Sequence, residues 1–257
     1  MRNTLSQVPR HGIAGFSSGV AMVLLLFMFA VAGVGWVYSG MVAQDRWPIR
    51  WLAVDGTFER VSAEQVRASL LPLAGGSFFT VDTPRMKETV AAMPWVASVA
   101  VQKSWPDSIL VTVNEHTPVA HWIDGLLLDG SGQPFLVPGA DEIQGLPWLA
   151  SPQGQMELVF ENWKKFDDKL AVIGQQVERL TLDARGSWSA RFNGGTEVRF
   201  GKGDIFKNLD TLVSAWAGLM HGQALPPVSV DLRYTNGFAV LWPENMDAVA
   251  GNYGKKG

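Results

Sequence analysis

The longest apolar segment of the chain runs from Gly12 to Gln44 and contains no charged side chain. A bilayer core is spanned by about 20 helical residues at about 1.5 Å each. The Val, Leu and Phe side chains between Val20 and Val42 favour insertion into such a core. The pattern therefore predicts a transmembrane helix over residues 12–44, preceded by a short tail at residues 1–11.

A cleaved signal peptide is the alternative for this segment. Arg2 and Arg10 precede the apolar run, and Ala30-Val31-Ala32 has the small residues of a signal-peptidase site. Cleavage there would leave the mainly apolar residues 33–42 at the new N-terminus, which favours an uncleaved anchor. Basic residues lie on both flanks of the segment, so charge alone does not fix its orientation.

Between residues 47 and 117, some segments repeat their hydrophobic residues with the spacing of a strand and others with the spacing of a helix. A Ser-x-x-Gln capping box starts the first helix, and proline follows the cap of the second. The expected elements are a strand at Ile49–Val54, a helix from Ser62, a helix capped by Thr83, and a hairpin of strands at Trp95–Gln102 and Ile109–Glu115. This β-α-α-β-β order is that of a POTRA domain, in which two helices cover one face of a three-stranded sheet.

Residues 118–243 read as a second, mixed β domain with two helices, followed by a flexible tail at residues 244–257. Strands are expected at Leu126–Leu128, Phe135–Val137, Val177–Leu182, Ser187–Phe192, Thr196–Phe200, Val228–Tyr234 and Phe238–Trp242, and helices from Met156 to Leu170 and after the cap Asp204. The whole chain is thus α+β, with an N-terminal helix, a POTRA domain, and an antiparallel sheet with flanking helices.

The last predicted strand follows an Asn236-Gly237 turn and ends the ordered part of the chain. A terminal strand is expected at a sheet edge, where its free backbone groups are either protected or used. The strand carries no charge, which favours use by a partner strand through β-augmentation. The alternative is that Phe238, Val240 and Trp242 are simply core residues.

Composition narrows the possible functions. The chain has 21 Lys and Arg against 24 Asp and Glu, with no basic cluster, which argues against nucleic-acid binding. It has no cysteine, so thiolate metal sites and thiol nucleophiles are excluded.

No catalytic or metal-binding motif stands out. His116 and His121 are five residues apart, which on a strand places them on opposite faces, so no metal site is predicted. Asp129-Gly-Ser-Gly132 has the residues of a hairpin turn and lacks the spaced carboxylates of a calcium loop. The sequence therefore predicts no catalytic residue, metal or cofactor, although a membrane-anchored exported enzyme remains a rival.

Four linked motifs carry a family resemblance. They are Pro94-Trp95-Val96, Trp105-Pro106-Asp107, Glu115-x-x-Pro118-Val119-Ala120-x-Trp122 and Asp129-x-x-Gly132-x-x-Phe135. In order and spacing they resemble the FtsQ (DivIB) family of bacterial cell-division proteins, as does the single N-terminal anchor. The chain departs from the family in its very short N-terminal tail and in its brief tail after Trp242.

The resemblance implies a function and a place. It implies a single-pass inner-membrane protein with a cytoplasmic N-terminus and a periplasmic domain at the division septum. Such a protein is a non-catalytic divisome scaffold that links early and late division proteins, binds the periplasmic segments of FtsB and FtsL through its terminal strand, and contacts other division proteins through its POTRA domain and membrane helix. The rival binding module is an exported POTRA-containing assembly or secretion component, which normally continues into a long β-barrel.

The resemblance also implies partner-binding positions. Carried over residue by residue, they are Arg185, Arg233, Tyr234, Asn236, Gly237, Phe238 and Trp242. The two arginines are expected to pair with a partner carboxylate. Phe238 is bulkier than the residue that the family often has there, which is expected to alter its contribution.

Overall fold

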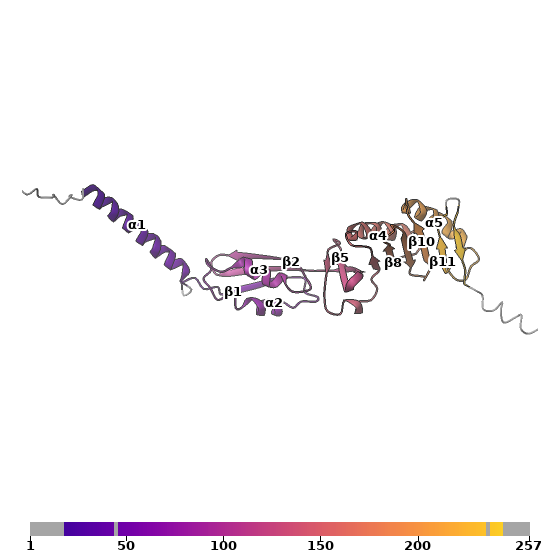
Figure 1. Ribbon diagram of the computed structural model, residues 1–257. Coiled ribbons are helices and arrows are strands. Elements are labelled where there is room, and N and C mark those ends of the chain that lie inside the picture. Colours follow the sequence, from indigo (N-terminus) through magenta and orange to yellow (C-terminus); the bar gives the residue numbers. More distant parts are fainter. Residues whose placement is uncertain (1–17, 44–45, 235–236, 244–257) are drawn as a thin grey trace, which may run out of the picture. The chain divides into compact units, whose positions relative to one another are not determined.

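A computed structural model describes residues 18–43, 46–234 and 237–243 (Figure 1). The predicted tails at residues 1–11 and 244–257, and Asn236 of the predicted site, lie outside the described residues. The chain divides into two compact units between Asn114 and Glu115, and each is described by itself below.

The first unit begins with α1 (Ser18–Val42), a helix of 25 residues. Its large apolar side chains face outward along its length, with Phe27 67% and Trp36 70% exposed. Within the described part of the chain, it is the one helix that is long and apolar enough to cross a membrane, over Gly19–Val42. A helix that is apolar on all sides and covered by no protein core fits membrane anchoring.

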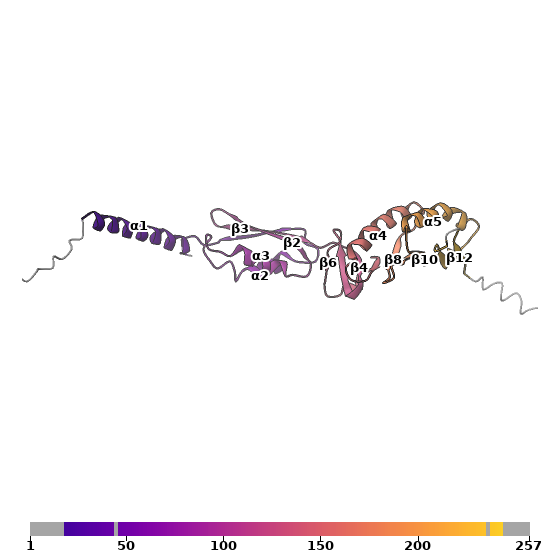
Figure 2. The ribbon, with the colours of Figure 1, turned by 45° about the horizontal axis from the view of Figure 1, so that its top comes forward.

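The rest of the first unit has the predicted POTRA order. Its elements are β1 (Trp51–Gly56), α2 (Ala63–Leu70), α3 (Thr83–Ala91), β2 (Val96–Ser104) and β3 (Ser108–Glu115). The sheet order is β1-β3-β2, with β1 parallel to β3, and α2 and α3 lie on one face of the sheet (Figure 2). Strand β1 starts two residues later than expected, and Pro48, before it, forms a separate antiparallel bridge with Ser77.

One of the two predicted helix caps in this domain is correct and the other is wrong. The capping box of α2 forms as expected: Gln65 N donates to Ser62 Oγ at 3.1 Å, and Ser62 N donates to Gln65 Oε1 at 3.0 Å. Helix α3 is capped by Asp82 instead of Thr83, since Arg85 N donates to Asp82 Oδ1 at 3.0 Å. An aspartate is at least as good a cap as a threonine, and its charge also favours the positive helix N-terminus.

The second unit is a nine-stranded sheet with the order β12-β11-β10-β9-β8-β7-β4-β5-β6. The strands are β4 (Pro118–Trp122), β5 (Leu126–Asp129), β6 (Pro134–Phe135), β7 (Trp148–Ala150), β8 (Val177–Leu182), β9 (Trp188–Phe192), β10 (Glu197–Gly201), β11 (Ser229–Asp231) and β12 (Ala239–Leu241). Two short 3₁₀ helices, η1 (Ile123–Gly125) and η2 (Ala140–Glu142), connect strands at one side of the sheet.

Helices α4 (Met156–Ala171) and α5 (Ile205–Met220) cover one face of this sheet (Figures 1 and 2). The covered face is apolar across neighbouring strands. Its buried side chains include Leu149, Leu180, Ala190, Val198 and Val230, which occupy matching positions in the strand register. Asp204 caps α5 as predicted, by accepting a hydrogen bond from Lys207 N at 3.1 Å.

Two strands were not predicted. Strand β4 lies between β5 and β7, and β7 pairs in parallel with both β4 and β8. Strand β7 has only three residues, which is too short for an alternating pattern to be recognised. Its position in the middle of the sheet comes from pairing with strands that are distant in sequence.

Candidate partner-binding surface

Strand β12 lies at the edge of the nine-stranded sheet, as the sequence predicts for the terminal strand. It pairs antiparallel with β11, from Ser229↔Leu241 to Asp231↔Ala239. Val228 N donates to Leu241 O at 2.8 Å, so the backbone groups of Leu241 face β11. Because successive residues of a strand direct these groups to opposite sides, the N–H and C=O of Val240 point away from β11 toward the free edge.

The side chains of this strand divide between core and solvent. Phe238 and Val240 are partly buried and pack against the core beneath the helices. The alternative that these side chains belong to the core is therefore correct in part. Leu241 is 60% exposed and Tyr234 is 62% exposed, while Trp242 is half-buried. The accessible features of the edge are therefore its backbone groups and the exposed side chains of Tyr234 and Leu241.

Arg233 is already paired within the chain. Its Nε donates to Asp231 Oδ1 at 2.8 Å, and its Nη2 donates to Asp231 Oδ2 at 2.6 Å. This hydrogen-bonded guanidinium lowers the pKa of Asp231 below its ordinary value and raises the pKa of Arg233. The arginine side chain is nevertheless half exposed, so further N–H groups remain accessible to a partner.

Gly201, at the end of β10, makes room for the stem of Arg233. It has a positive φ of +73°, and a Cβ added there would lie 2.9 Å from Arg233 Cγ. A side chain at this position would be strained and would displace the arginine. The glycine therefore helps to place Arg233 at this end of the sheet.

Arg185 lies in the tight turn between β8 and β9. Asp183 closes this turn by accepting hydrogen bonds from Ser187 N at 2.8 Å and from Arg185 N at 2.9 Å. The bond from Ser187 is the main cause of the lowered pKa of Asp183. Among the described residues, no ion pair engages the guanidinium of Arg185, which is exposed at the tip of the turn.

The strand register brings these residues to one end of the sheet. Leu182 pairs with Trp188, Trp188 with Gly201, Arg199 with Asp231, and Asp231 with Ala239. The turn that carries Arg185, the residue Arg233 and the start of β12 therefore share an end, although some 50 residues of sequence separate them. At about 4.8 Å per strand, the turn lies roughly 17 Å from β12, a span that one partner segment covers.

A recess of about 420 Å³ opens at the same end of the sheet. Arg233, Tyr234 and Gly237 line it together with Lys202, which precedes α5, and Lys207, in the first turn of α5. Sequence reasoning missed these two lysines as part of the site. The signal available was Gly201-Lys-Gly203, a glycine-flanked lysine directly before a capped helix.

The predicted site is thus only partly gathered. Trp242 follows the other end of β12, roughly 13 Å along the strand from Phe238, and Asn236 lies outside the described residues. The surface that the structure brings together consists of the edge of β12 with Arg185, Arg233, Tyr234, Gly237 and Phe238.

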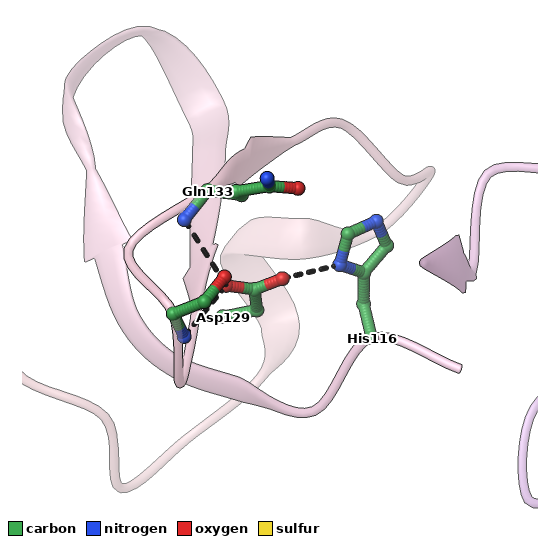
Figure 3. A network of polar contacts seen from close by, with 4 residues as sticks. His116, Asp129 and Gln133 are labelled. Carbon is green, nitrogen blue, oxygen red and sulfur yellow. Dashed lines mark hydrogen bonds and ion pairs between the residues drawn. The ribbon is translucent and has the colours of Figure 1, made fainter. Parts of the chain in front are cut away.

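His116 belongs to a hydrogen-bonded network around Asp129. Asp129 Oδ1 accepts hydrogen bonds from Ser131 N at 2.9 Å and from Gln133 N at 3.0 Å, and Asp129 Oδ2 accepts one from His116 Nδ1 at 2.8 Å (Figure 3). The His116 ring also stacks on Phe135, with 4.2 Å between centroids. These contacts confirm the predicted hairpin turn at Asp129-Gly-Ser-Gly132.

The charge of Asp129 is stabilised by this network. Burial alone would raise the pKa of Asp129, but the hydrogen bonds from Ser131, Gln133 and His116 outweigh burial and lower it. His121 is held separately, with Nε2 2.7 Å from Ile143 O and its ring stacked on Trp148. Across the residues that the structure describes, no three His, Cys, Asp or Glu side chains form a group that could hold a metal ion.

Comparisons with known proteins agree with this architecture. The family described as "POTRA domain, FtsQ-type" matches residues 47–116, and that described as "Cell division protein FtsQ/DivIB, C-terminal" matches residues 120–233. The second match ends before β12.

Individual proteins match over most of the chain. The "Cell division protein FtsQ" of Xanthomonas campestris pv. campestris is 37% identical over 221 residues, which cover 84% of this chain and 79% of that protein. That of Hahella chejuensis is 31% identical over 94% of this chain and 84% of its own, and that of Escherichia coli is 29% identical over 94% and 90%. Together with the POTRA order and the apolar N-terminal helix, these matches show that the chain belongs to the FtsQ family of cell-division proteins.

Proposed function

We propose that this protein is a non-catalytic scaffold of the divisome that binds the periplasmic segments of FtsB and FtsL by strand addition to β12. In this proposal α1 crosses the inner membrane once, with the N-terminus in the cytoplasm and both folded units in the periplasm at the septum. The POTRA domain and α1 contact other division proteins, so that the chain links early and late members of the assembly. Family membership and the apolar helix support this arrangement.

The observation that carries the proposal is the free edge of β12. The N–H and C=O of Val240 point outward, and a partner strand laid along this edge would form a pair of hydrogen bonds with them. Each such bond contributes about 1 kcal/mol net, so the backbone gives a modest but specific attachment. Tyr234 and Leu241, both mainly exposed, supply apolar contact area beside it.

Charge at the same end of the sheet favours an acidic partner. Lys202, Lys207 and Arg233 line the recess, and Arg185 lies at the same end of the sheet. The carboxylates at this end, Asp183, Asp204 and Asp231, already accept hydrogen bonds within the chain. Arg185 is available to a partner carboxylate directly. Arg233 has to share its guanidinium with Asp231, so its contribution to partner affinity is expected to be smaller than that of Arg185.

Substitution of Val240 tests the strand-addition proposal. Val240→Pro removes the outward N–H and places a ring on the free edge, while Leu241 O still accepts from Val228 N. Val240→Ala is the matched control, because it shortens the half-buried side chain but keeps the N–H. Binding of the full chain in detergent to a complex of FtsB and FtsL is measured for both variants, with circular dichroism to check their folding.

We expect Val240→Pro to lower the affinity for the FtsB and FtsL complex by at least about tenfold. The affinity of Val240→Ala should stay within about threefold of that of the unaltered protein. Equal binding by a folded Val240→Pro variant would mean that the edge of β12 is not where the partner strand attaches. Absence of binding by the unaltered protein would overturn the proposed partners themselves.

A further inference from the structure

One end of the POTRA domain carries large aromatic side chains in solvent. Trp105, at the tip of the β2–β3 hairpin, is 71% exposed, and Trp51, at the start of β1, is 67% exposed. Phe79, in the segment before α3, is 41% exposed. Clustered apolar surface of this kind on a small domain marks an interaction site more often than a single exposed ring does.

Contacts within the domain bring these three residues to the same end. Trp51 pairs with Ser108 in the strand register, and Trp51 N donates to Asp107 O at 3.3 Å, so β1 begins beside the hairpin tip (Figure 1). Lys103, two residues before Trp105, donates from Nζ to Phe79 O at 3.2 Å. The three aromatic side chains therefore lie at one exposed end of the domain, which is called the aromatic surface below. Trp51 alternates with Leu52 and Val54, which pack on the core, so its ring lies on the sheet face away from the helices.

Cationic side chains lie at the same end of the domain. Lys103 Nζ lies 5.9 Å from the centroid of Phe78, and its side chain is exposed. Arg46 and Arg50, which lead into β1, are also exposed. Arg50 Nε lies 3.9 Å from Asp107 Oδ2, yet the Arg50 side chain retains 69% of its accessible surface. Tryptophan together with Lys and Arg is the composition that proteins place at the level of lipid headgroups, where rings enter the interface and cationic heads reach phosphate.

Chain length ties the surface to the end of α1. Helix α1 ends at Val42, and Trp47 follows five residues later. Even a fully extended chain of five residues spans at most about 17 Å. Trp47 in turn packs edge-on against Phe79, with 5.4 Å between ring centroids. The aromatic surface consequently cannot lie far from the point where α1 leaves a bilayer.

We propose that this end of the POTRA domain, with Trp51, Phe79, Trp105 and Lys103, rests in the headgroup region of the bilayer that α1 crosses. The inference rests on the proposed role of α1 as a membrane anchor. The occupant of the surface is lipid: rings lie among the glycerol and upper acyl groups, and the cations contact phosphate. The POTRA domain is then held at a fixed height and tilt on the membrane instead of swinging from a linker.

The absence of cysteine from the chain makes this proposal directly testable. A single cysteine is introduced into the full-length protein at Ser104, beside the hairpin tip, and labelled with a fluorophore. A second variant carries it at Ala97, an exposed position on the same strand, roughly 23 Å away. A third carries it at Val31, in the middle of α1. Each protein is reconstituted in vesicles of phosphatidylcholine and phosphatidylglycerol that contain a lipid with a nitroxide quencher at the headgroup.

We expect loss of fluorescence at Ser104 on addition of the quencher lipid, and none at Ala97. Quenching of Val31 by a lipid with the nitroxide deep in the acyl chain reports on the anchor separately. If Val31 is quenched and Ser104 is not, the anchor stands and the interfacial role of the POTRA end is overturned. If Val31 is not quenched, the proposal that α1 is a membrane anchor is overturned. Equal quenching at Ser104 and Ala97 would overturn the proposal that this end of the POTRA domain rests in the headgroup region.

A double substitution tests whether the rings are responsible. Trp51→Ser with Trp105→Ser removes two exposed indoles that make little core contact, so the domain is expected to stay folded. The proposal requires the Ser104 label to lose most of its quenching in this background, while the Val31 label keeps its own. Unchanged quenching at Ser104 would show that these rings do not hold the domain at the interface.

Discussion

Asp129 stabilises the β5–β6 hairpin through one carboxylate that accepts hydrogen bonds from three residues. Asp129→Ala leaves the N–H groups of Ser131 and Gln133 and the ring nitrogen of His116 without their acceptor. We expect it to destabilise the β5–β6 hairpin by roughly 1–3 kcal/mol. Asp129→Asn keeps an acceptor for the turn N–H groups and is expected to cost less. Hydrogen exchange of the amides in β5 and β6 measures both effects.

The stabilisation by Asp129 also depends on pH. Since the pKa of Asp129 is lower in the folded protein than in the unfolded chain, its contribution is fully present above the unfolded value and is lost as the pH falls through the folded value. The difference in protection between the unaltered protein and Asp129→Asn should therefore be constant near neutral pH and shrink below about pH 4. A difference that stayed constant into that acid range would contradict the role of the charge.

At the scale of single residues, the structure shows how two of the residues singled out in the sequence are held. Asp129 was correctly predicted to form a turn. Arg233 was expected to be available for a partner carboxylate, whereas the structure pairs it with Asp231, two residues before it. That pairing depends on the backbone path after β11, which local sequence patterns do not specify.

Helix α3 illustrates how local signals compete at the scale of an element. Asp82 and Thr83 are both good capping residues and stand next to each other before Pro84. Because Asp82 is the residue that accepts from Arg85 N, Asp82→Ala is expected to lower the stability of α3 by about 1 kcal/mol. Thr83→Ala, inside the first turn, should change it by a few tenths at most. Hydrogen exchange of the first amides of α3 distinguishes the two, and a larger effect of Thr83→Ala would contradict the assigned cap.

The strands show which elements a local sequence pattern can predict and which it cannot. The alternating segments at β8, β9 and β10 were predicted within a residue or two, since each buries one face under α4 and α5. Strand β7 was missed, because its three residues become a strand only through parallel pairing with β4 and β8. The edge position of β12 was predicted from its place in the sequence. The partial burial of Phe238 and Val240 could not be predicted in this way, because it depends on how the rest of the core packs against this strand.

For the whole molecule, the apolar helix is the feature with the largest consequence. A central arginine costs roughly 2.5–3.5 kcal/mol on insertion, so Leu26→Arg with Phe29→Arg should shift the full chain from the membrane fraction toward the soluble or aggregated fraction. Val20→Arg with Ala21→Arg, near the start of α1, carries the same added charge but allows the side chains to reach the headgroups. This control should remain in the membrane. Equal loss from both variants would argue against a spanning helix.

The sequence by itself determined the elements whose signals are local and strong. These are the apolar α1, the β-α-α-β-β order of the POTRA domain, the turn at Asp129 and the terminal position of β12, together with the motifs that resemble the FtsQ family. Periodicity, capping and turn chemistry act within a few residues, so they can be read without knowledge of the fold.

Only the tertiary structure decided which distant residues meet. It set the sheet order, inserted β7 between β4 and β8, and brought Arg185 to the same end of the sheet as Arg233. It also gathered Trp51, Phe79 and Trp105 at one end of the POTRA domain. The physical reason is that strand register and helix packing depend on burial summed over the whole core, which no local window of the sequence contains.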